Sequence, residues 1–495
     1  MATESLPNKE GHAKALGREE GPRIQHTEPK SPDIVDFDGL QDPQNPLNWS
    51  SARKITSIAI ISCLTFVLPL ISTIIAPGTE DVLRDFNSTD KTLGSFVTTA
   101  YVLGGVAGPT VIAPCSELYG RSITYQVSSL LFFIFNVACA VANNLGALVI
   151  FRLFAAVVGS CSITIGAGSI ADMVPQEKRA AAMAGWAMGP ILAPSIGPII
   201  GAYLTPAKGW RWVFWVSTLL TGVCAILSLA LKESYPYTIL QRKTAKLRKE
   251  TGNQNLRSKL DTGKTPRELF AFSIFRPLKM LFGSPVLFLI PVYVALIYAY
   301  IYLCFTTFPR VFMDAYGFSL GQAGLAYLGI GVGSLIGLLL CGATMDRISK
   351  FLTTRNGGDF RPEYRLPPMA VGVLVVPAGL FWYGWTAEHR NHWILPIIGT
   401  AFLGAGMNIT FMVSQTYLVD AYTVYAASAA AGTTILRSLI GALLPLAGNN
   451  LYDSLGIGWG TSLLGFIALT FIPGPYLLYV YGEKFREYRL FRVKF

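Results

Sequence analysis

Charged residues are scarce in this sequence. Asp, Glu, Lys and Arg make up 14% of its 495 residues, whereas 52% are hydrophobic. An average soluble domain carries about 25% charged residues, because its whole surface faces water. The composition therefore excludes an ordinary soluble protein and predicts a chain with much of its surface in lipid.

Residues that bind metals or carry out catalysis are scarce too. The four histidines, His12, His26, His389 and His392, lie outside the long apolar runs, so none can act as a proton relay within the membrane. His389 and His392 are near enough in sequence to share a metal, but we interpret them as part of an exposed polar loop. The seven cysteines contain no CxxC pair, which argues against disulfides and zinc. We expect no metal, no cofactor and no enzyme active site.

Long uncharged runs make up most of the remaining sequence. A helix needs about 20 apolar residues to cross the hydrocarbon core of a bilayer. Six such runs occur in each half, and 122–151 is long enough for one helix, a turn and the start of the next. We therefore predict an all-α membrane protein with about twelve transmembrane helices. The runs are 55–77, 92–116, 122–151, 153–171, 180–207, 212–231, 280–309, 315–345, 366–387, 393–419, 421–452 with Arg437 inside it, and 454–482.

Polar segments divide these helices into two groups of six. The first 50 residues lack the layout of a cleavable signal sequence, and the segment 237–251 can form a basic helix on the membrane surface. Two bundles joined by a long loop suggest a duplicated transporter with a shared cavity at the bundle interface. The predicted parts are a disordered cytoplasmic tail at 1–50, a six-helix bundle at 51–231, a cytoplasmic central loop at 232–283, a six-helix bundle at 284–482 and a cytoplasmic tail at 483–495.

The basic residues predict the orientation of the chain. Its net charge is +11, and most of the Lys and Arg residues fall on one side when both termini are placed in the cytoplasm, as expected for retained cationic loops. We interpret the positive charge as a topology determinant that can touch anionic lipid headgroups. We therefore expect no nucleic-acid partner.

Two arginines, Arg152 and Arg437, stand inside predicted spans. A cation there costs about 2.5–3.5 kcal/mol on insertion scales, so it usually faces a cavity or a partner. Each arginine has a structural interpretation, in which it pins helices through backbone carbonyls. Each also has a functional one, in which a fixed cation shifts neighbouring carboxylate pKa values and attracts anions. We favour proton coupling or gating for Arg152, and leave both interpretations open for Arg437.

Charges at the cytoplasmic ends of spans predict a gate. Glu117 and Arg121 follow span two, and Asp172 ends span four. A pair that forms in only one state biases a rocking equilibrium. The alternative is an ordinary surface ion pair worth at most about 1 kcal/mol.

The second half repeats this pattern. Asp346 and Arg347 follow span eight, and Asp420 ends span ten, the counterpart of the span that Asp172 ends. We predict that these residues form the matching half of the gate. The repetition itself supports two related bundles.

Span five is rich in glycine and proline. Small residues at every fourth position make a close-packing face, and proline removes backbone hydrogen bonds and bends a helix. Helix packing explains part of the pattern, but we predict a bend beside the cavity. The residues are Gly189, Pro190, Gly197, Pro198 and Gly201.

Polar and aromatic residues within the second half predict substrate contacts. Tyr298 and Tyr302 lie in span seven, and Asn408 and Gln415 lie in span ten. The tyrosines can instead be packing or interfacial residues. We favour Asn408, because an amide at mid-span needs a partner.

One glycosylation sequon is topologically usable. Asn87-Ser88-Thr89 lies in the first loop on the predicted outer side. We expect Asn87 to carry a glycan.

Several motifs resemble those of the major facilitator superfamily, and within it the fungal twelve-span drug:proton antiporters. The run from Gly108-Pro109 through Ser116-Glu117 to Gly120-Arg121 resembles the signature between spans two and three. Arg152 with Gly159 resembles the span-four motif, whose arginine the resemblance implicates in proton coupling. The glycines and prolines of span five resemble the antiporter motif.

Other matches extend the resemblance over nearly everything after residue 40. They are Asn45-Pro46-Leu47-Asn48-Trp49, Trp210-Arg211-Trp212, Pro362-Glu363-Tyr364-Arg365-Leu366-Pro367 and Tyr417-Leu418-Val419-Asp420-Ala421-Tyr422. Ala193 and Ala202 depart from the pattern, since glycine is common at both positions. The resemblance implies two six-helix bundles and export by antiport.

The expected function is a proton-coupled secondary transporter in the plasma membrane. It exports small amphipathic organic molecules, such as a toxin, drug or secondary metabolite, by alternating access. Its expected partners are a small-molecule substrate, protons and the lipid bilayer, and we expect a monomer. The alternatives are an importer or symporter of a nutrient or polyamine on the same fold, and a membrane sensor that does not transport.

Overall fold

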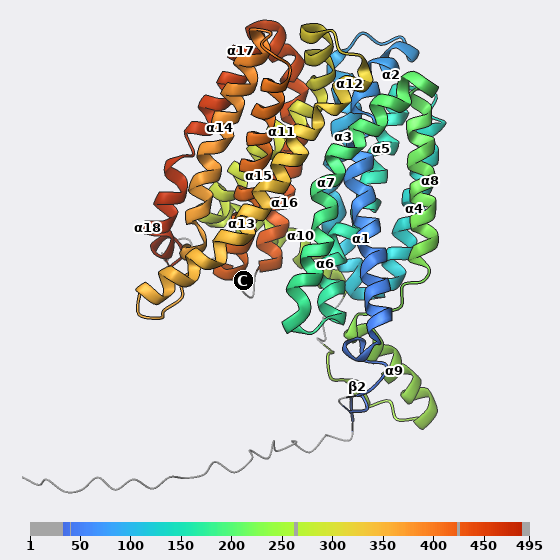
Figure 1. The fold of residues 1–495 in the computed structure, drawn as a ribbon. Helices are drawn as coiled ribbons and strands as arrows, with labels where there is room; N and C mark the ends of the chain where they lie inside the picture. Colours follow the sequence, from blue (N-terminus) through green and yellow to red (C-terminus); the bar gives the residue numbers. More distant parts are fainter. Residues whose placement is uncertain (1–32, 40, 262–265, 423–425, 488–495) are drawn as a thin grey trace, which may run out of the picture.

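Figure 1 shows the computed structural model, which describes residues 33–39, 41–261, 266–422 and 426–487. Eleven helical segments in these ranges are long and apolar enough to cross a membrane. The last of them, Ser428–Lys484, turns back at Gly456, whose φ of 76° and ψ of 172° interrupt the helix. It therefore holds two spans, and the prediction of twelve transmembrane helices is confirmed.

The first six spans form one bundle. Two of its connections are single glycines, Gly120 with φ 98° and Gly209 with φ 88°, a backbone conformation that side chains disfavour. The fourth span consists of α5 and α6 in sequence. The helices are α1 (Ser51–Thr73), α2 (Thr79–Asp85), α3 (Lys91–Tyr119), α4 (Arg121–Ala140), α5 (Leu145–Gly159), α6 (Cys161–Met173), α7 (Gln176–Lys208) and α8 (Trp210–Ser228).

The remaining six spans form a second bundle with its own hydrophobic core. Span eight joins α12 to α13, and the turn at Gly456 within α17 separates spans eleven and twelve. The helices are α11 (Pro285–Tyr316), α12 (Leu320–Leu325), α13 (Tyr327–Arg355), α14 (Pro367–Glu388), α15 (Ile394–Tyr422), α16 (Ala426–Leu443), α17 (Gly448–Leu469) and α18 (Pro473–Glu487).

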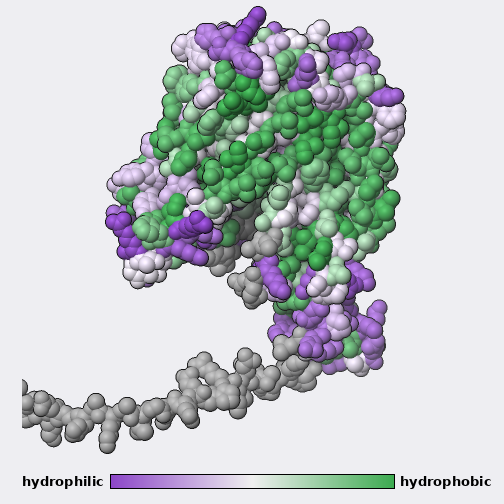
Figure 2. Space-filling view, in the orientation of Figure 1, coloured by the Kyte–Doolittle hydropathy of each residue, from purple (hydrophilic) through white to green (hydrophobic). Residues whose placement is uncertain are grey.

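The outer surface of the bundles is apolar. Ile226, Leu219 and Leu229 on or beside α8 are each about 70% exposed. Figure 2 shows hydrophobic residues over the flanks of the helices and hydrophilic residues at both ends. This distribution is that of a multi-pass membrane protein, since an aqueous surface rarely exposes a continuous apolar belt.

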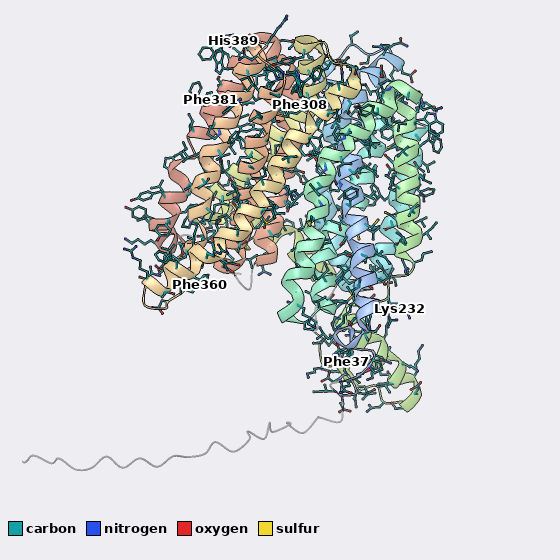
Figure 3. The ribbon with its side chains drawn as sticks, in the orientation of Figure 1. Phe37, Lys232, Phe308, Phe360, Phe381 and His389 are labelled. Atoms are coloured by element: carbon teal, nitrogen blue, oxygen red, sulfur yellow. The ribbon has the colours of Figure 1, made fainter. Side chains whose placement is uncertain are left out.

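Two ends of the molecule can be distinguished by the elements they carry. We call the end with α9 (Pro236–Thr251) the α9 side and the end with α2 the α2 side (Figure 1). α10 (Pro266–Gly283) leads from the central loop into α11. Figure 3 labels Lys232 and Phe360 at the α9 side, one on each bundle and well apart, and His389 at the α2 side.

The described part of the N-terminal tail is ordered, contrary to the prediction of a disordered tail. β1 (Ile34–Val35) pairs in parallel with β2 (Arg257–Ser258) of the central loop. Lys243 of α9 forms ion pairs with Asp38 at 2.8 Å and with Asp42 at 3.7 Å. The acidic tail segment therefore packs on the basic helix, a charge match between segments that sequence reasoning treated separately. Residues 1–32 lie outside the described residues.

The small residues of α7 face two neighbours. A Cβ atom at Gly197 would lie 2.5 Å from the carbonyl oxygen of Leu70, and one at Gly201 would lie 1.8 Å from that of Ile74. On the side of the second bundle, a Cβ atom at Gly324 would lie 2.4 Å from the Cβ of Ala202. Thus α7 packs tightly between α1 and the second bundle, and the alanine at 202 faces a glycine across the interface.

We expect Gly201→Ala to destabilise the protein, because the added methyl overlaps a backbone oxygen that cannot move freely. Overpacking of this kind costs about 1–3 kcal/mol. Gly185→Ala is the matched control, since a Cβ there meets nothing within 4 Å. Thermal unfolding in detergent, followed by tryptophan fluorescence, should show a lower Tm for Gly201→Ala only. Equal Tm values for the two variants would contradict the close packing of α1 and α7.

Candidate functional site

A cavity lies between the two bundles. Its empty volume is about 540 Å³, part of it open to solvent. Helices α1, α3, α5 and α6 line it from the first bundle, and α11 and α16 line it from the second. The lining residues are Leu68, Pro69, Ser72, Tyr101, Val102, Gly105, Pro109, Ala156, Ser160, Ile163, Thr164, Tyr298, Tyr302, Thr434, Arg437 and Ser438.

The two tyrosines predicted to contact substrate lie in this cavity. The Tyr302 hydroxyl is 3.0 Å from the Ser72 hydroxyl, so the two bundles are hydrogen-bonded across the cavity wall. The Tyr298 hydroxyl donates to the Tyr302 hydroxyl at 3.4 Å. The structure thus brings Tyr298, Tyr302 and Ser72 together at the bundle interface.

Arg437 enters the cavity from α16. Its guanidinium carbon lies 4.7 Å from the centre of the Tyr298 ring and 5.1 Å from that of Phe411. Such cation–π contacts stabilise a partly desolvated arginine. Its Nε atom is buried and has no hydrogen-bond partner in the described part of the chain.

Arg152 lies deeper, and only 1% of its surface is exposed. Its Nε donates to the carbonyl oxygen of Val97 at 2.6 Å, and an Nη donates to that of Ser72 at 2.9 Å. The guanidinium also lies over the rings of Tyr101 at 5.0 Å and Phe214 at 5.7 Å. Arg152 therefore ties α1, α3 and α8 to α5, and its proton-coupling role stays a prediction.

Ser72 joins the two arginines into one network. Its backbone carbonyl accepts from Arg152, while its hydroxyl bonds Tyr302, which contacts Tyr298 beneath Arg437. The network crosses from the first bundle to the second. Any rotation of one bundle against the other must therefore stretch or break the bond between Ser72 and Tyr302.

The two predicted amides do not line this cavity. Asn408 is 5% exposed, and its amide nitrogen lies 3.5 Å from the carbonyl oxygen of Gly404 on its own helix. Gln415 is partly buried on the same helix, α15. Neighbouring residues Met407 and Phe411 instead face Arg437 in a narrow crevice. The helical turn of α15 presents those side chains, which hydropathy alone does not reveal.

Polar contacts join the bundles on the α2 side. Lys91 at the start of α3 forms an ion pair with Asp453 of α17 at 3.5 Å, and Asp453 also pairs with Arg310 of α11. The Asn449 amide donates to the Ser95 hydroxyl at 3.3 Å. We call Lys91, Asp453, Asn449 and Ser95 the α2-side lock, because each contact links one bundle to the other.

On the α9 side, the predicted gate residues of the first bundle meet one another. Arg121 pairs with Asp172 at 3.4 Å and donates to Ser116 at 2.6 Å. Its backbone N–H and that of Ser122 donate to the Glu233 carboxylate, which stands at the N-terminus of α4 where negative charge is favoured. Glu117 is partly exposed, one turn earlier on α3.

In the second bundle, one arginine outside the predicted gate set, Arg365, contacts both Asp346 and Asp420. Arg365 bonds Asp420 at 3.0 Å and also pairs with Asp346. Burial lowers the pKa of Arg365, but the hydrogen bonds and the negative charges of Asp346 and Asp420 together raise it by more, so the net shift is upward. Arg347, beside Asp346 on α13, is exposed. The predicted role of Arg347 in the gate stays a prediction.

Sequence reasoning missed several of these residues, although two carried a signal. Arg365 stands in the motif 362–367 that was matched before span nine, and Asp453 is a lone charge between two apolar runs. Ser72 and Glu233 carried none, since their roles depend on helices distant in sequence.

Asn87 lies in the loop between α2 and α3 and is exposed. It is on the opposite side of the spans from the N-terminal segment (Figure 1). Its glycosylation stays a prediction. Among the described residues, no group of three or more His, Cys, Asp or Glu side chains is arranged to hold a metal ion.

Known proteins resemble the chain over most of its length. It is 56% identical to "MFS-type transporter penM" of Penicillium rubens, over 94% of this chain and 92% of that protein. It is 47% identical to "Efflux pump radE" of Floropilus chiversii, over 94% and 87%. A solved D-xylose-proton symporter shares the fold with a TM-score of 0.63 at 16% identity, over 86% of this chain and 97% of that one. The family model for the Major Facilitator Superfamily matches residues 61–445. The chain therefore belongs to the Major Facilitator Superfamily.

Proposed function

We propose that this transporter exports small amphipathic organic molecules by proton-coupled alternating access. The observation that carries the proposal is a cavity bounded by both bundles, with the bundles bonded together on the α2 side and diverging on the α9 side (Figures 1 and 2). An exporter binds its substrate in a conformation of this kind, in which the bundles are joined on one side and apart on the other. A relative named an efflux pump supports the direction.

The α9 side is the cytoplasmic side in this proposal. It carries the basic helix α9 and the Lys-rich and Arg-rich central loop, and such loops stay in the cytoplasm. Both termini then face the cytoplasm, and the α2 side faces the exterior of the plasma membrane. The cavity is built within one chain, so a monomer suffices for transport.

Release to the exterior requires the bundles to rock about the cavity. The α2-side lock and the bond between Ser72 and Tyr302 must then open, while the ends on the α9 side close. An exposed ion pair contributes only about 0.2–1 kcal/mol. A lock made of a few such contacts can therefore open and reform within the transport cycle.

Asp172 is our candidate for the coupled proton site. It is partly buried and paired with Arg121 where the first bundle faces the cytoplasm. Protonation would remove the charge that holds Arg121 and free this cation for a partner on the second bundle. No carboxylate stands among the described residues that line the cavity. Proton coupling therefore runs through the charged residues at the cytoplasmic end of the first bundle.

The rival function is import, since the same fold serves a protein named a D-xylose-proton symporter. The test uses inside-out vesicles with an acidic lumen, in which the lumen stands for the cell exterior. Dansyl-phenylalanine and its neutral amide serve as fluorescent amphipathic probes. We expect the vesicles to accumulate at least one probe, and a protonophore to abolish the accumulation. Proton-driven loss of a preloaded probe from the lumen would establish symport instead.

We expect Asp453→Asn to weaken closure on the α2 side, because it removes the carboxylate that pairs with Lys91 across the bundle interface and with Arg310. Spin labels at Thr89→Cys and Ser454→Cys, in a background without the native cysteines, report the distance between the bundles there. Electron spin resonance should show a larger long-distance population in the variant. Asp81→Asn is the control, since Asp81 pairs within one helix with Arg84. An unchanged distance distribution in Asp453→Asn would refute the lock.

Asp172→Asn should abolish proton-driven accumulation while leaving probe binding intact, because the amide cannot take up the coupled proton. The measurement is accumulation in the acid-lumen vesicles together with probe binding in detergent. Asp359→Asn, at an exposed position on the same side, is the matched control. Proton-driven accumulation at the wild-type rate in Asp172→Asn would exclude Asp172 as the coupling site.

A further inference from the structure

The two arginines inside the membrane differ in whether the protein itself accepts hydrogen bonds from them. Arg152 donates to two backbone carbonyls through Nε and Nη2, and its buried Nη1 has no hydrogen-bond partner among the described residues. Arg437 makes neither a hydrogen bond nor an ion pair in the described part of the chain, and its buried Nε has no acceptor. Nothing in the packing of the second bundle therefore uses the hydrogen-bonding capacity of Arg437.

The rings beside Arg437 stabilise its charge without using its donors. The Tyr298 and Phe411 rings attract the guanidinium through their electron-rich faces. They engage the face of the guanidinium plane, whereas its N–H groups point outward along the edges. The edge of this plane is the part that binds a carboxylate through two parallel hydrogen bonds.

Arg437 is the one charged residue among the described residues that line the cavity. Hydroxyl groups of Tyr298, Tyr302, Thr434 and Ser438 line the same cavity. These groups can donate to an anion, and none of them can neutralise a cation. The electrostatics of the cavity therefore favour a negatively charged ligand and disfavour a positively charged one.

Apolar surface adjoins the charge. Val294, Ile297 and Met407 line a crevice next to Arg437, and Leu68, Val102 and Ile163 line the cavity on its other side. A ligand that places an acidic group on Arg437 can therefore bury an apolar body against either wall. Removal of such a body from water favours binding through the hydrophobic effect.

We propose that Arg437 is the substrate-specificity residue of this transporter and that its substrates are amphipathic organic acids, each with a carboxylate or similar anionic group beside an apolar body. The claim that these ligands are transported rests on the proposed function. The claim that the cavity binds organic acids does not. It excludes polyamines and other cations as ligands of this cavity.

The test compares two ligands of the same shape and different charge. Dansyl-phenylalanine carries a carboxylate, and its amide is neutral. Binding to the purified full-length protein in detergent is followed by dansyl fluorescence, with empty micelles subtracted. We expect the wild type to bind the acid at least tenfold more tightly than the amide, and Arg437→Gln to bind the two equally. Arg437→Lys should keep part of the preference, since it keeps the charge but loses the planar fork.

Arg355→Gln is the control, because Arg355 is exposed at the end of α13 and away from the cavity. It should bind both ligands as the wild type does. If the wild type binds the acid no better than the amide, or binds neither, the inference is overturned. A preference retained in Arg437→Gln overturns it as well.

The two proposals can fail separately. Binding is measured without a proton gradient, so a charge preference that depends on Arg437 stands even if neither ligand accumulates in the acid-lumen vesicles. Accumulation of the amide alone would leave the export proposal intact and remove the preference for acids.

Discussion

Two guanidinium groups lie inside the apolar layer, and the cost of holding them there shapes the centre of this protein. A cation near mid-membrane is tolerated only with polar partners, aromatic faces or water beside it. Arg152 takes backbone carbonyls of α1 and α3, which fixes the helices that form one wall of the cavity. Arg437 takes two aromatic rings and faces the cavity itself. Arg152 thus holds the cavity wall in place, and Arg437 is available to a ligand.

The interface between the bundles combines close packing with weak polar contacts. Small residues let α7 lie against both α1 and the second bundle, as the short distances at Gly201 and Gly324 show. The polar contacts across the interface are few and partly exposed, such as the pair between Lys91 and Asp453. Surfaces of this kind can slide or rock without breaking a large apolar core, because each bundle has its own.

The charge clusters at the α9 side are built in the same way in the two bundles. Each cluster centres on an arginine held by carboxylates, Arg121 with Asp172 in the first bundle and Arg365 with Asp420 in the second. Both arginines lie where the chain enters the third span of its bundle, since Arg121 begins α4 and Arg365 lies just before α14. The N-terminal segment packs on α9 beside the first bundle, which joins the tail and the central loop to that half of the molecule.

The sequence by itself determined the number of spans, their grouping into two bundles and which charges stand within or beside them. Run length and charge are local properties, so they can be read without knowing the fold. Only the tertiary structure decided which partner each charge has: Arg365 for Asp346, backbone carbonyls for Arg152, and aromatic rings for Arg437. It also placed Asn408 against its own helix and not in the cavity. The reason is that a membrane helix is apolar on its lipid face and on its core face alike. Its pattern therefore carries little information about rotation, which is set by packing against helices far away in the sequence.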